Sequence, residues 1–123
     1  MKRILLALSL FPVSAVAQDA PKDYKAETML KLCSGPQSDA PRDLQSSVCT
    51  FRLQGVVSIM VENCLTRKQG LDPAPVMTAS PPPSIGAVKQ AYRNFLRDSP
   101  ELWGLPWHHA AMMAISEAFP CDE

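Results

Sequence analysis

The sequence predicts an all-α fold: a small, disulfide-stapled bundle of about four helices. Apolar residues recur at intervals of three and four in several segments, which is the spacing of one face of a helix. Most of the 12 prolines cluster between those segments and leave them uninterrupted, as expected for helices joined by stiff loops. The four cysteines of the 123-residue chain, an even number, indicate two disulfides.

The first 17 residues have the three parts of a secretory signal peptide. Lys2 and Arg3 give a short basic start, residues 4–15 form an apolar run, and Ala15-Val16-Ala17 is a small-residue cleavage site. The apolar run is too short to cross a bilayer comfortably, so we expect no membrane anchor after cleavage. We expect a signal peptide over 1–17, one helical domain over 18–123 and, from the bacterial type of signal, a periplasmic location.

Two helices are expected in the first half of the domain. One runs from Tyr24 to Cys33, and Gly35-Pro36 ends it. Asp43 can cap the next helix, which Gly70 ends. The β-branched residues between 56 and 61 would suit a strand, but the spacing of the apolar positions is helical. The expected apolar positions of this long helix include Leu44, Val48, Phe51, Gly55, Ile59 and Met60.

A proline-rich connection over 71–83 leads to two more helices and should be partly extended. Ser84 can cap the third helix, which Ser99-Pro100 ends. Pro106 suits the first turn of the fourth helix, which runs to Phe119. The third helix has Ile85, Val88, Tyr92, Phe95 and Leu96 on one side, and the fourth has a stripe suited to close packing: Ala110, Met113, Ala114 and Ala118.

The positions of the cysteines restrict how they can pair. Cys49 and Cys64 lie on one expected helix, roughly 22 Å apart at a rise of about 1.5 Å per residue. A disulfide needs α-carbons within about 7 Å, so this pair is excluded if the helix is continuous. Of the two pairings that remain, a short loop between antiparallel helices favours Cys33–Cys49 with Cys64–Cys121. Metal binding and redox chemistry are the functional alternatives, but the chain has no Cys-x-x-Cys pair.

Residues that perform catalysis or bind metals are sparse. His108 and His109 are the only histidines, and neighbours on a helix point about 100° apart, which makes them a poor pair of ligands for one metal. Met112-Met113 could bind a soft metal, but a place in the helical core is favoured. No motif offers a positioned serine nucleophile, a carboxylate pair or a phosphate-binding loop. We therefore expect no enzyme, no metal and no cofactor, and a net charge of about −2 beyond residue 17 predicts no nucleic-acid partner.

The turn between the third and fourth expected helices carries two tryptophans, Trp103 and Trp107. Indoles are enriched where proteins bind proteins, although either ring could instead cover a small core. Trp103 lies beside Gly104 and is the better candidate for exposure. We therefore expect Glu101, Leu102 and Trp103 to contact a protein partner. The stiff proline-rich connection is a second candidate contact, although a plain connector is favoured there.

Four short motifs, spread over most of residues 18–123, resemble those of the Rap1a/Tai family of immunity proteins. Met29-Leu30-Lys31-Leu32-Cys33 is similar to the family's first-helix LLxxC element, and Cys49 with Gly55 six residues later is similar to CxxYIxG. The segment from Tyr92 to Glu101 is similar to kyLxxhPe, and Ala118-Phe119-Pro120-Cys121 to the terminal AFPC.

The resemblance implies a small helical protein, often dimeric, that covers the active cleft of a peptidoglycan amidase effector of type VI secretion. The expected function is therefore that of a periplasmic immunity protein, an amidase inhibitor. The chain departs from the family pattern at Arg52, where an aromatic residue is usual, and in a longer proline-rich connection between Cys64 and Ser84. The alternative is a periplasmic stress chaperone, which resembles the small acid-resistance chaperones and binds many unfolded clients, or another envelope protein-interaction module.

Overall fold

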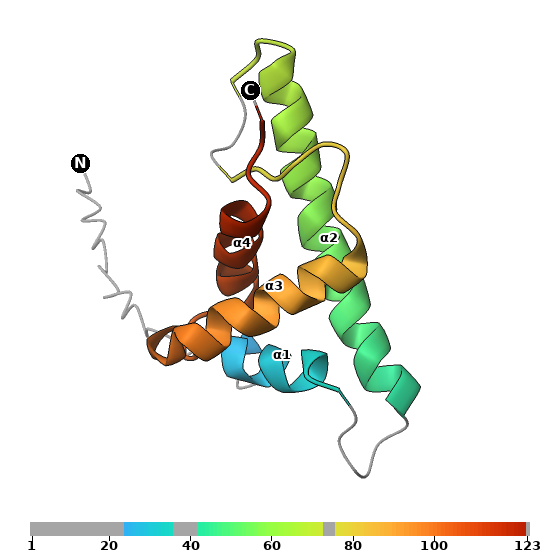
Figure 1. The fold of residues 1–123 in the computed structure, drawn as a ribbon, viewed down its shortest axis with the longest axis vertical. Coiled ribbons are helices and arrows are strands. Elements are labelled where there is room, and N and C mark those ends of the chain that lie inside the picture. Colours follow the sequence, from blue (N-terminus) through green and yellow to red (C-terminus); the bar gives the residue numbers. More distant parts are fainter. Residues whose placement is uncertain (1–23, 36–41, 73–75, 123) are drawn as a thin grey trace, which may run out of the picture.

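The computed structural model describes residues 24–35, 42–72 and 76–122, so the expected signal peptide over 1–17 lies outside the described residues. Four α-helices follow one another along the chain (Figure 1): α1 (Ala26–Cys33), α2 (Arg42–Lys68), α3 (Ile85–Asp98) and α4 (Trp107–Ala118). A short 3-10 helix, η2 (Pro100–Leu102), lies between the last two. The described residues contain no β-strand, only an isolated antiparallel bridge. The predicted all-α, disulfide-stapled bundle of about four helices is confirmed.

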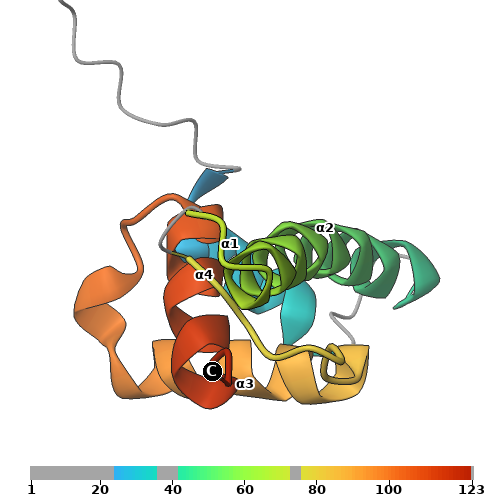
Figure 2. The same ribbon diagram turned by 90° about the horizontal axis from the view of Figure 1, so that it is seen from above.

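Each of the four helices packs against the other three. The longest is α2, with 27 residues, and Figures 1 and 2 show the three shorter helices gathered on one side of it. Their apolar faces enclose a single core, whose largest fully buried side chains include Met29, Leu53, Met60, Tyr92, Leu96 and Ile115. The other side of α2 faces away from the bundle.

The sequence prediction was most accurate for α3, because the signals that define this helix are local. The Ser84 hydroxyl caps the helix as predicted, by accepting a hydrogen bond from the Ala87 amide (3.2 Å). Val88 and Tyr92, one helical turn apart, are fully buried. The Tyr92 hydroxyl also donates a hydrogen bond to the Ala26 carbonyl oxygen (3.2 Å), which joins α3 to the start of α1. The predicted apolar side of α3 is therefore its buried side.

The face of α2 that packs in the core differs from the predicted one. Leu44, Phe51 and Ile59, three of the predicted apolar positions, are 64%, 72% and 67% exposed. The buried positions are Cys49, Leu53, Val57, Met60 and Cys64, so that Met60 alone of the predicted set is buried. Both sets recur at helical spacing, and the period therefore does not distinguish them. The cysteines distinguish them, because each must face the element that carries its disulfide partner.

The first two helices begin at residues other than those predicted. α1 begins at Ala26 instead of Tyr24, because Lys25 is extended and takes part in the isolated bridge. Tyr24, which was predicted on the apolar side of this helix, is exposed. α2 begins at Arg42, which places Asp43 inside the helix and not at its N-cap.

The buried side of α4 is made of small residues, as predicted, but the set is different. Ala110 and Ala114 are buried, together with Ala111 and Ile115, which were not predicted. Met113 and Ala118, the other two predicted positions, are exposed. The helix ends at Ala118, and Pro106 is its extended N-cap residue, one position before the first turn.

Both disulfides have the favoured pairing. Cys33–Cys49 joins the end of α1 to α2 with a Cα–Cα distance of 5.3 Å, and Cys64–Cys121 joins α2 to the segment after α4 at 5.7 Å. In the loop-closure model, bridges that span 16 and 57 residues contribute about 3 and about 4 kcal/mol of stability. Two structural disulfides place the chain in an oxidising, non-cytoplasmic compartment.

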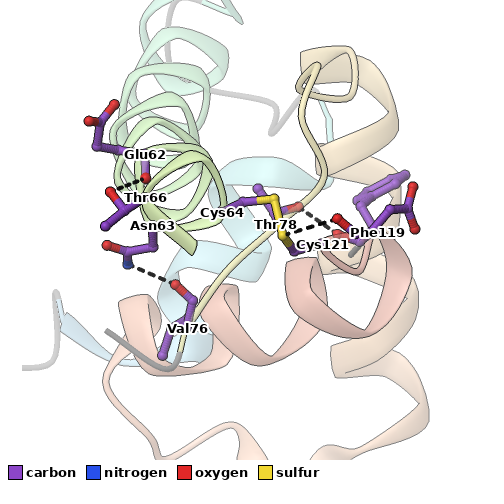
Figure 3. Close-up of a disulfide and its surroundings, with 9 residues drawn as sticks. Glu62, Asn63, Cys64, Thr66, Val76, Thr78, Phe119 and Cys121 are labelled. Atoms are coloured by element: carbon purple, nitrogen blue, oxygen red, sulfur yellow. Dashed lines mark hydrogen bonds between the residues drawn. A yellow bond between two sulfur atoms is a disulfide. The ribbon is translucent and has the colours of Figure 1, made fainter. Parts of the chain in front are cut away.

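The described part of the proline-rich connection contains no helix, as predicted, and hydrogen bonds fix it between α2 and the C-terminal segment (Figure 3). The Asn63 side chain donates to the Val76 carbonyl oxygen (2.8 Å). Thr78 is fully buried, and its hydroxyl donates to the Phe119 carbonyl oxygen (2.8 Å). The Thr78 amide donates to the carbonyl oxygen of Met60 (3.2 Å). These bonds hold Val76 in a fixed position beside α2.

Candidate functional site

The three residues expected to bind a partner lie together on the turn after α3, but they are not equally accessible. Glu101 is exposed, whereas Leu102 and Trp103 are half-buried and pack against the core. The indole Nε1–H of Trp103 donates a hydrogen bond to the Leu96 carbonyl oxygen (2.7 Å). The same carbonyl oxygen, in the last turn of α3, also accepts a hydrogen bond from the Ser99 amide (3.3 Å), so the indole is its second donor. The expectation that Trp103 is more exposed than Trp107 is not confirmed, because both are half-buried.

Backbone hydrogen bonds fix the turn against the start of α1. The Ala26 amide donates to the Leu105 carbonyl oxygen (2.7 Å), and the Glu27 amide donates to the carbonyl oxygen of Trp103 (3.1 Å). Both amides belong to the first turn of α1, where no intrahelical acceptor exists. The turn therefore presents the Glu101 carboxylate from a rigid support.

Arg52 and Trp107 form the contact between α2 and the first turn of α4. The Arg52 guanidinium lies over the Trp107 ring, with its central carbon 5.5 Å from the ring centroid. Its Nη1 is buried and has no hydrogen-bond partner among the described residues. A cation over an aromatic face gains energy, while a buried donor without an acceptor costs energy, so the two effects oppose each other. Sequence reasoning singled out Arg52 only as a departure from a family pattern.

The two histidines come closer than their position on the helix suggested. The ring centroids of His108 and His109 are 4.4 Å apart and the rings meet edge to face at 69°. Side-chain rotation brings together rings whose Cα–Cβ bonds diverge, so the expected divergence is wrong for the rings themselves. Burial, followed by the neighbouring His109 ring, lowers the pKa of His108 below its ordinary value. His108 is half-buried and His109 is exposed.

The outer side of α4 forms one wall of an apolar pocket of about 350 Å³. His109, Met112 and Met113 supply this wall. Val76 and Leu105, which lie outside α4, also line the pocket. Met113 is 44% exposed and Met112 is half-buried. The expected place of this pair in the helical core is therefore wrong for Met113 and only partly right for Met112, which packs against the core.

Apolar residues recur at helical spacing along the side of α2 that faces away from the bundle. We call it the α2 outer face and define it as Leu44, Val48, Phe51, Gly55 and Ile59. Three of its side chains are among the large apolar groups that the structure exposes. A methyl group added to Gly55 would meet no atom within 4 Å, so the space above the middle of this surface is open. Sequence reasoning found these residues by their period but assigned them to the core.

By length and composition, α2 also meets the criterion for a membrane-spanning helix, over Ser47–Lys68. One third of that window is buried inside the bundle, and both disulfides attach to it. The long core helices of globular bundles meet the same criterion, so it is weak support for a membrane span. The buried residues Leu53, Val57 and Met60 contribute to the apolar character of the window as well as the α2 outer face.

Over the described ranges, no three side chains of His, Cys, Asp or Glu lie close enough together to hold a metal ion. All four cysteines are in disulfides and none offers a thiolate.

The chain matches no family model, no curated protein and no solved structure. The resemblance to the Rap1a/Tai family therefore depends on the four short motifs. Cys33, Cys49 and Cys121 of those motifs form disulfides, and Gly55 lies on the α2 outer face. Three of the four motifs thus contain residues that staple the bundle, and one also contributes to an exposed apolar surface.

Proposed function

We propose that this chain is an exported, periplasmic immunity protein that binds a peptidoglycan amidase effector of type VI secretion and occludes its active cleft. The observation that carries the proposal is the α2 outer face, where three large apolar side chains are about two thirds exposed on a helix that two disulfides fix. Exposed apolar surface of this kind marks sites where proteins bind proteins. The inhibitor performs no chemistry itself.

The size of the α2 outer face suits one specific protein interface. Three side chains of roughly 200 Å² each, about two thirds exposed, offer on the order of 400 Å² of apolar surface. Apolar atoms make up about 60% of a typical interface, which implies roughly 650 Å² for each partner. The total of about 1,300 Å² lies within the range of specific protein complexes.

The arrangement of this surface along one long helix supports occlusion as the mode of inhibition. The exposed side chains form a ridge along the helix, and Phe51, the most exposed large apolar residue in the described part of the chain, lies near the middle of this ridge. A ridge can enter a cleft that accepts an extended wall peptide, and the inhibitor then excludes the substrate by filling the same space. Because the disulfides hold α2 in place, little conformational entropy is lost when the ridge docks.

The turn that carries Glu101, Leu102 and Trp103 is the competing contact surface. Figures 1 and 2 both place the end of α3 on the side of the molecule away from α2, so a single cleft does not cover both surfaces. Within the turn, Glu101 is the residue that is free to contact a partner, while the other two pack on the core.

The test uses residues 18–123 with the disulfides intact and an amidase with a Cys-His pair encoded beside this gene or captured from an envelope extract. We expect Phe51→Ala with Ile59→Ala to weaken amidase binding and inhibition at least tenfold, with an unchanged circular dichroism spectrum. Leu71→Ala is the matched control, because it removes a similarly exposed (60%) apolar side chain outside the α2 outer face. If inhibition falls only in the Glu101→Ala variant, the turn and not the α2 outer face is the surface that contacts the amidase.

The same measurements separate a contact between two copies from a contact with the effector. Sedimentation of the unmodified chain and of the double variant reports the oligomeric state of each. A dimer that the double variant dissociates while amidase inhibition stays intact would show that the α2 outer face joins two copies, and the effector assignment would then be wrong.

The exposed α2 outer face also favours a second candidate, a periplasmic stress chaperone, since apolar ridges bind unfolded chains. A chaperone suppresses the aggregation of several unrelated clients, most strongly at low pH, and the effect is lost in the Phe51 and Ile59 double variant. An immunity protein binds one enzyme tightly and leaves client aggregation unchanged.

A further inference from the structure

The outer side of α4 concentrates the soft metal ligands of this chain. Both histidines and two of the six methionines lie within residues 108–113. His109, Met112 and Met113 stand at positions i, i+3 and i+4, which places their side chains side by side on one helix face. The three line the same pocket of about 350 Å³.

The packing of α4 accounts in part for Met112, which packs against the core, but it does not require His109 or Met113 on the outer side. The buried face of the helix consists of Ala110, Ala111, Ala114 and Ile115. His109 is exposed and Met113 is 44% exposed, although methionine is an apolar residue that ordinarily fills gaps in cores. Packing alone therefore does not explain why an exposed thioether and an exposed imidazole lie beside Met112 in one pocket.

We propose that His109, Met112 and Met113 bind a Cu(I) ion in this pocket, through one imidazole nitrogen and two thioether sulfurs. Thioether ligands are soft and select Cu(I) among the biological first-row metal ions, and imidazole also suits copper. The flexible methionine side chains can turn their sulfurs onto one ion, because each has three rotatable bonds. Met112 and Met113 lie three and four positions after His109, which places the Cβ atom of each about 5–6 Å from that of His109. Their longer side chains allow the two adjacent methionines to share one ion, which the shorter side chains of adjacent histidines would not allow.

The surroundings favour Cu(I) over other cations. Among the described residues, the pocket lining contains no carboxylate, one imidazole and one hydroxyl, that of Ser116. A single hydroxyl is too few oxygen ligands for Mg²⁺ or Ca²⁺, and structural Zn²⁺ sites need four nitrogen, sulfur or carboxylate ligands. All four cysteines are in disulfides, so no thiolate of the chain competes for the ion. Val76, fixed by its hydrogen bond from Asn63, and Leu105 supply apolar lining next to the three proposed ligands.

His108 has a positioning role in this arrangement. Its ring does not line the pocket, but it meets the His109 ring edge to face at 4.4 Å and contacts Trp107 on its other side (5.8 Å). The half-buried His108 thereby restricts the rotation of the exposed His109 ring.

The test is a titration of residues 18–123, with disulfides intact and under anaerobic conditions. Ag(I) serves as a redox-inert probe in calorimetry, and Cu(I) affinity is measured by competition with a chromogenic Cu(I) chelator. We expect one equivalent of each ion, with shifts of the Met112 and Met113 methyl resonances. Met112→Leu with Met113→Leu keeps the volume of the side chains and should weaken Cu(I) binding at least 100-fold, and His109→Asn at least tenfold.

Met77→Leu is the matched control, because Met77 is half-buried, neighbours Val76 and does not line the pocket. The affinity of the Met77→Leu variant for Cu(I) should stay within twofold of the affinity of the unmodified chain. Three results would overturn the proposal: no stoichiometric uptake of Ag(I) or Cu(I), an affinity that the double leucine variant leaves unchanged, or equal losses in Met77→Leu. Tighter binding of Zn²⁺ than of Cu(I), lost in His108→Asn, would show a site made by the histidine pair instead. This proposal does not depend on the amidase proposal.

Discussion

Trp103 closes the end of α3 by donating its indole N–H to the carbonyl oxygen of Leu96, at 2.7 Å. The two residues are seven positions apart, and the bond turns the chain back over the core immediately after the helix ends. A tryptophan that sequence reasoning placed in a binding surface is therefore also a structural residue. Its substitution affects the fold before it affects any partner.

For Trp103, the prediction concerns stability. Trp103→Phe removes the hydrogen bond but retains an aromatic ring, and should lower the free energy of unfolding by about 1 kcal/mol. Trp103→Ala also removes the packing of the ring on the core and should cost about 3 kcal/mol. Urea unfolding of both variants measures the two losses. Equal stabilities of Trp103→Ala and the unmodified chain would mean that the ring does not contribute to the core.

For Arg52 we predict that a substitution leaves the free energy of unfolding unchanged or raises it, unlike the substitutions of Trp103. Its Nη1 is buried without a hydrogen-bond partner among the described residues, so replacing the guanidinium removes an unsatisfied donor. Methionine keeps an apolar stem and a favourable sulfur contact with the Trp107 ring. Arg52→Met should therefore leave the free energy of unfolding within about 1 kcal/mol of its original value or raise it. A loss above about 2 kcal/mol would show that the guanidinium finds an acceptor, such as bound water.

The two disulfides should differ in their contributions to stability. In the loop-closure model, removing Cys64–Cys121, which spans 57 residues, costs about 1 kcal/mol more than removing Cys33–Cys49, which spans 16. The double alanine variants of each pair, unfolded in urea, provide the comparison. If the shorter bridge proves more important, the model of unfolded-state entropy does not describe this chain.

Tyr92 predicts a loss of stability in alkali. Burial raises the pKa of its phenol above the ordinary value near 10, so that above this pH the unfolded chain releases a proton that the folded chain retains. The unfolded state then binds fewer protons, and stability falls by up to about 1.4 kcal/mol for each pH unit. Below pH 9 this contribution is absent.

Tyr92→Phe provides the control for that pH dependence. The variant loses the hydrogen bond to Ala26, which costs about 1 kcal/mol at neutral pH, but it has no phenol to titrate. The stability difference between the two chains should therefore shrink and change sign between pH 10 and 12. A difference that stays constant over this range would argue against a buried, protonated phenol.

Local patterns determined much of the fold. Ser84 and the four-residue spacing from Val88 to Tyr92 specify the start and the buried side of α3, because a cap and its helix face involve only neighbouring residues. The pairing of the cysteines also followed from the sequence. A continuous helix separates Cys49 from Cys64 by a distance that no disulfide spans, and the structure contains the pairing that the short loop favoured.

Which surfaces stay exposed depended on the contacts between helices. α2 carries two apolar faces with the same helical spacing, and only the packing of α1, α3 and α4 selects the one that contains Leu53 and leaves Phe51 in solvent. Tertiary structure also decides the hydrogen bond of Trp103, which depends on where the chain turns after α3. The contact between the His108 and His109 rings depends on side-chain rotation, which the sequence does not specify. The sequence by itself determined the helices and their covalent links, since these depend on local period and chain distance. Tertiary packing decided which faces remain available for binding, because burial is a property of how the helices meet.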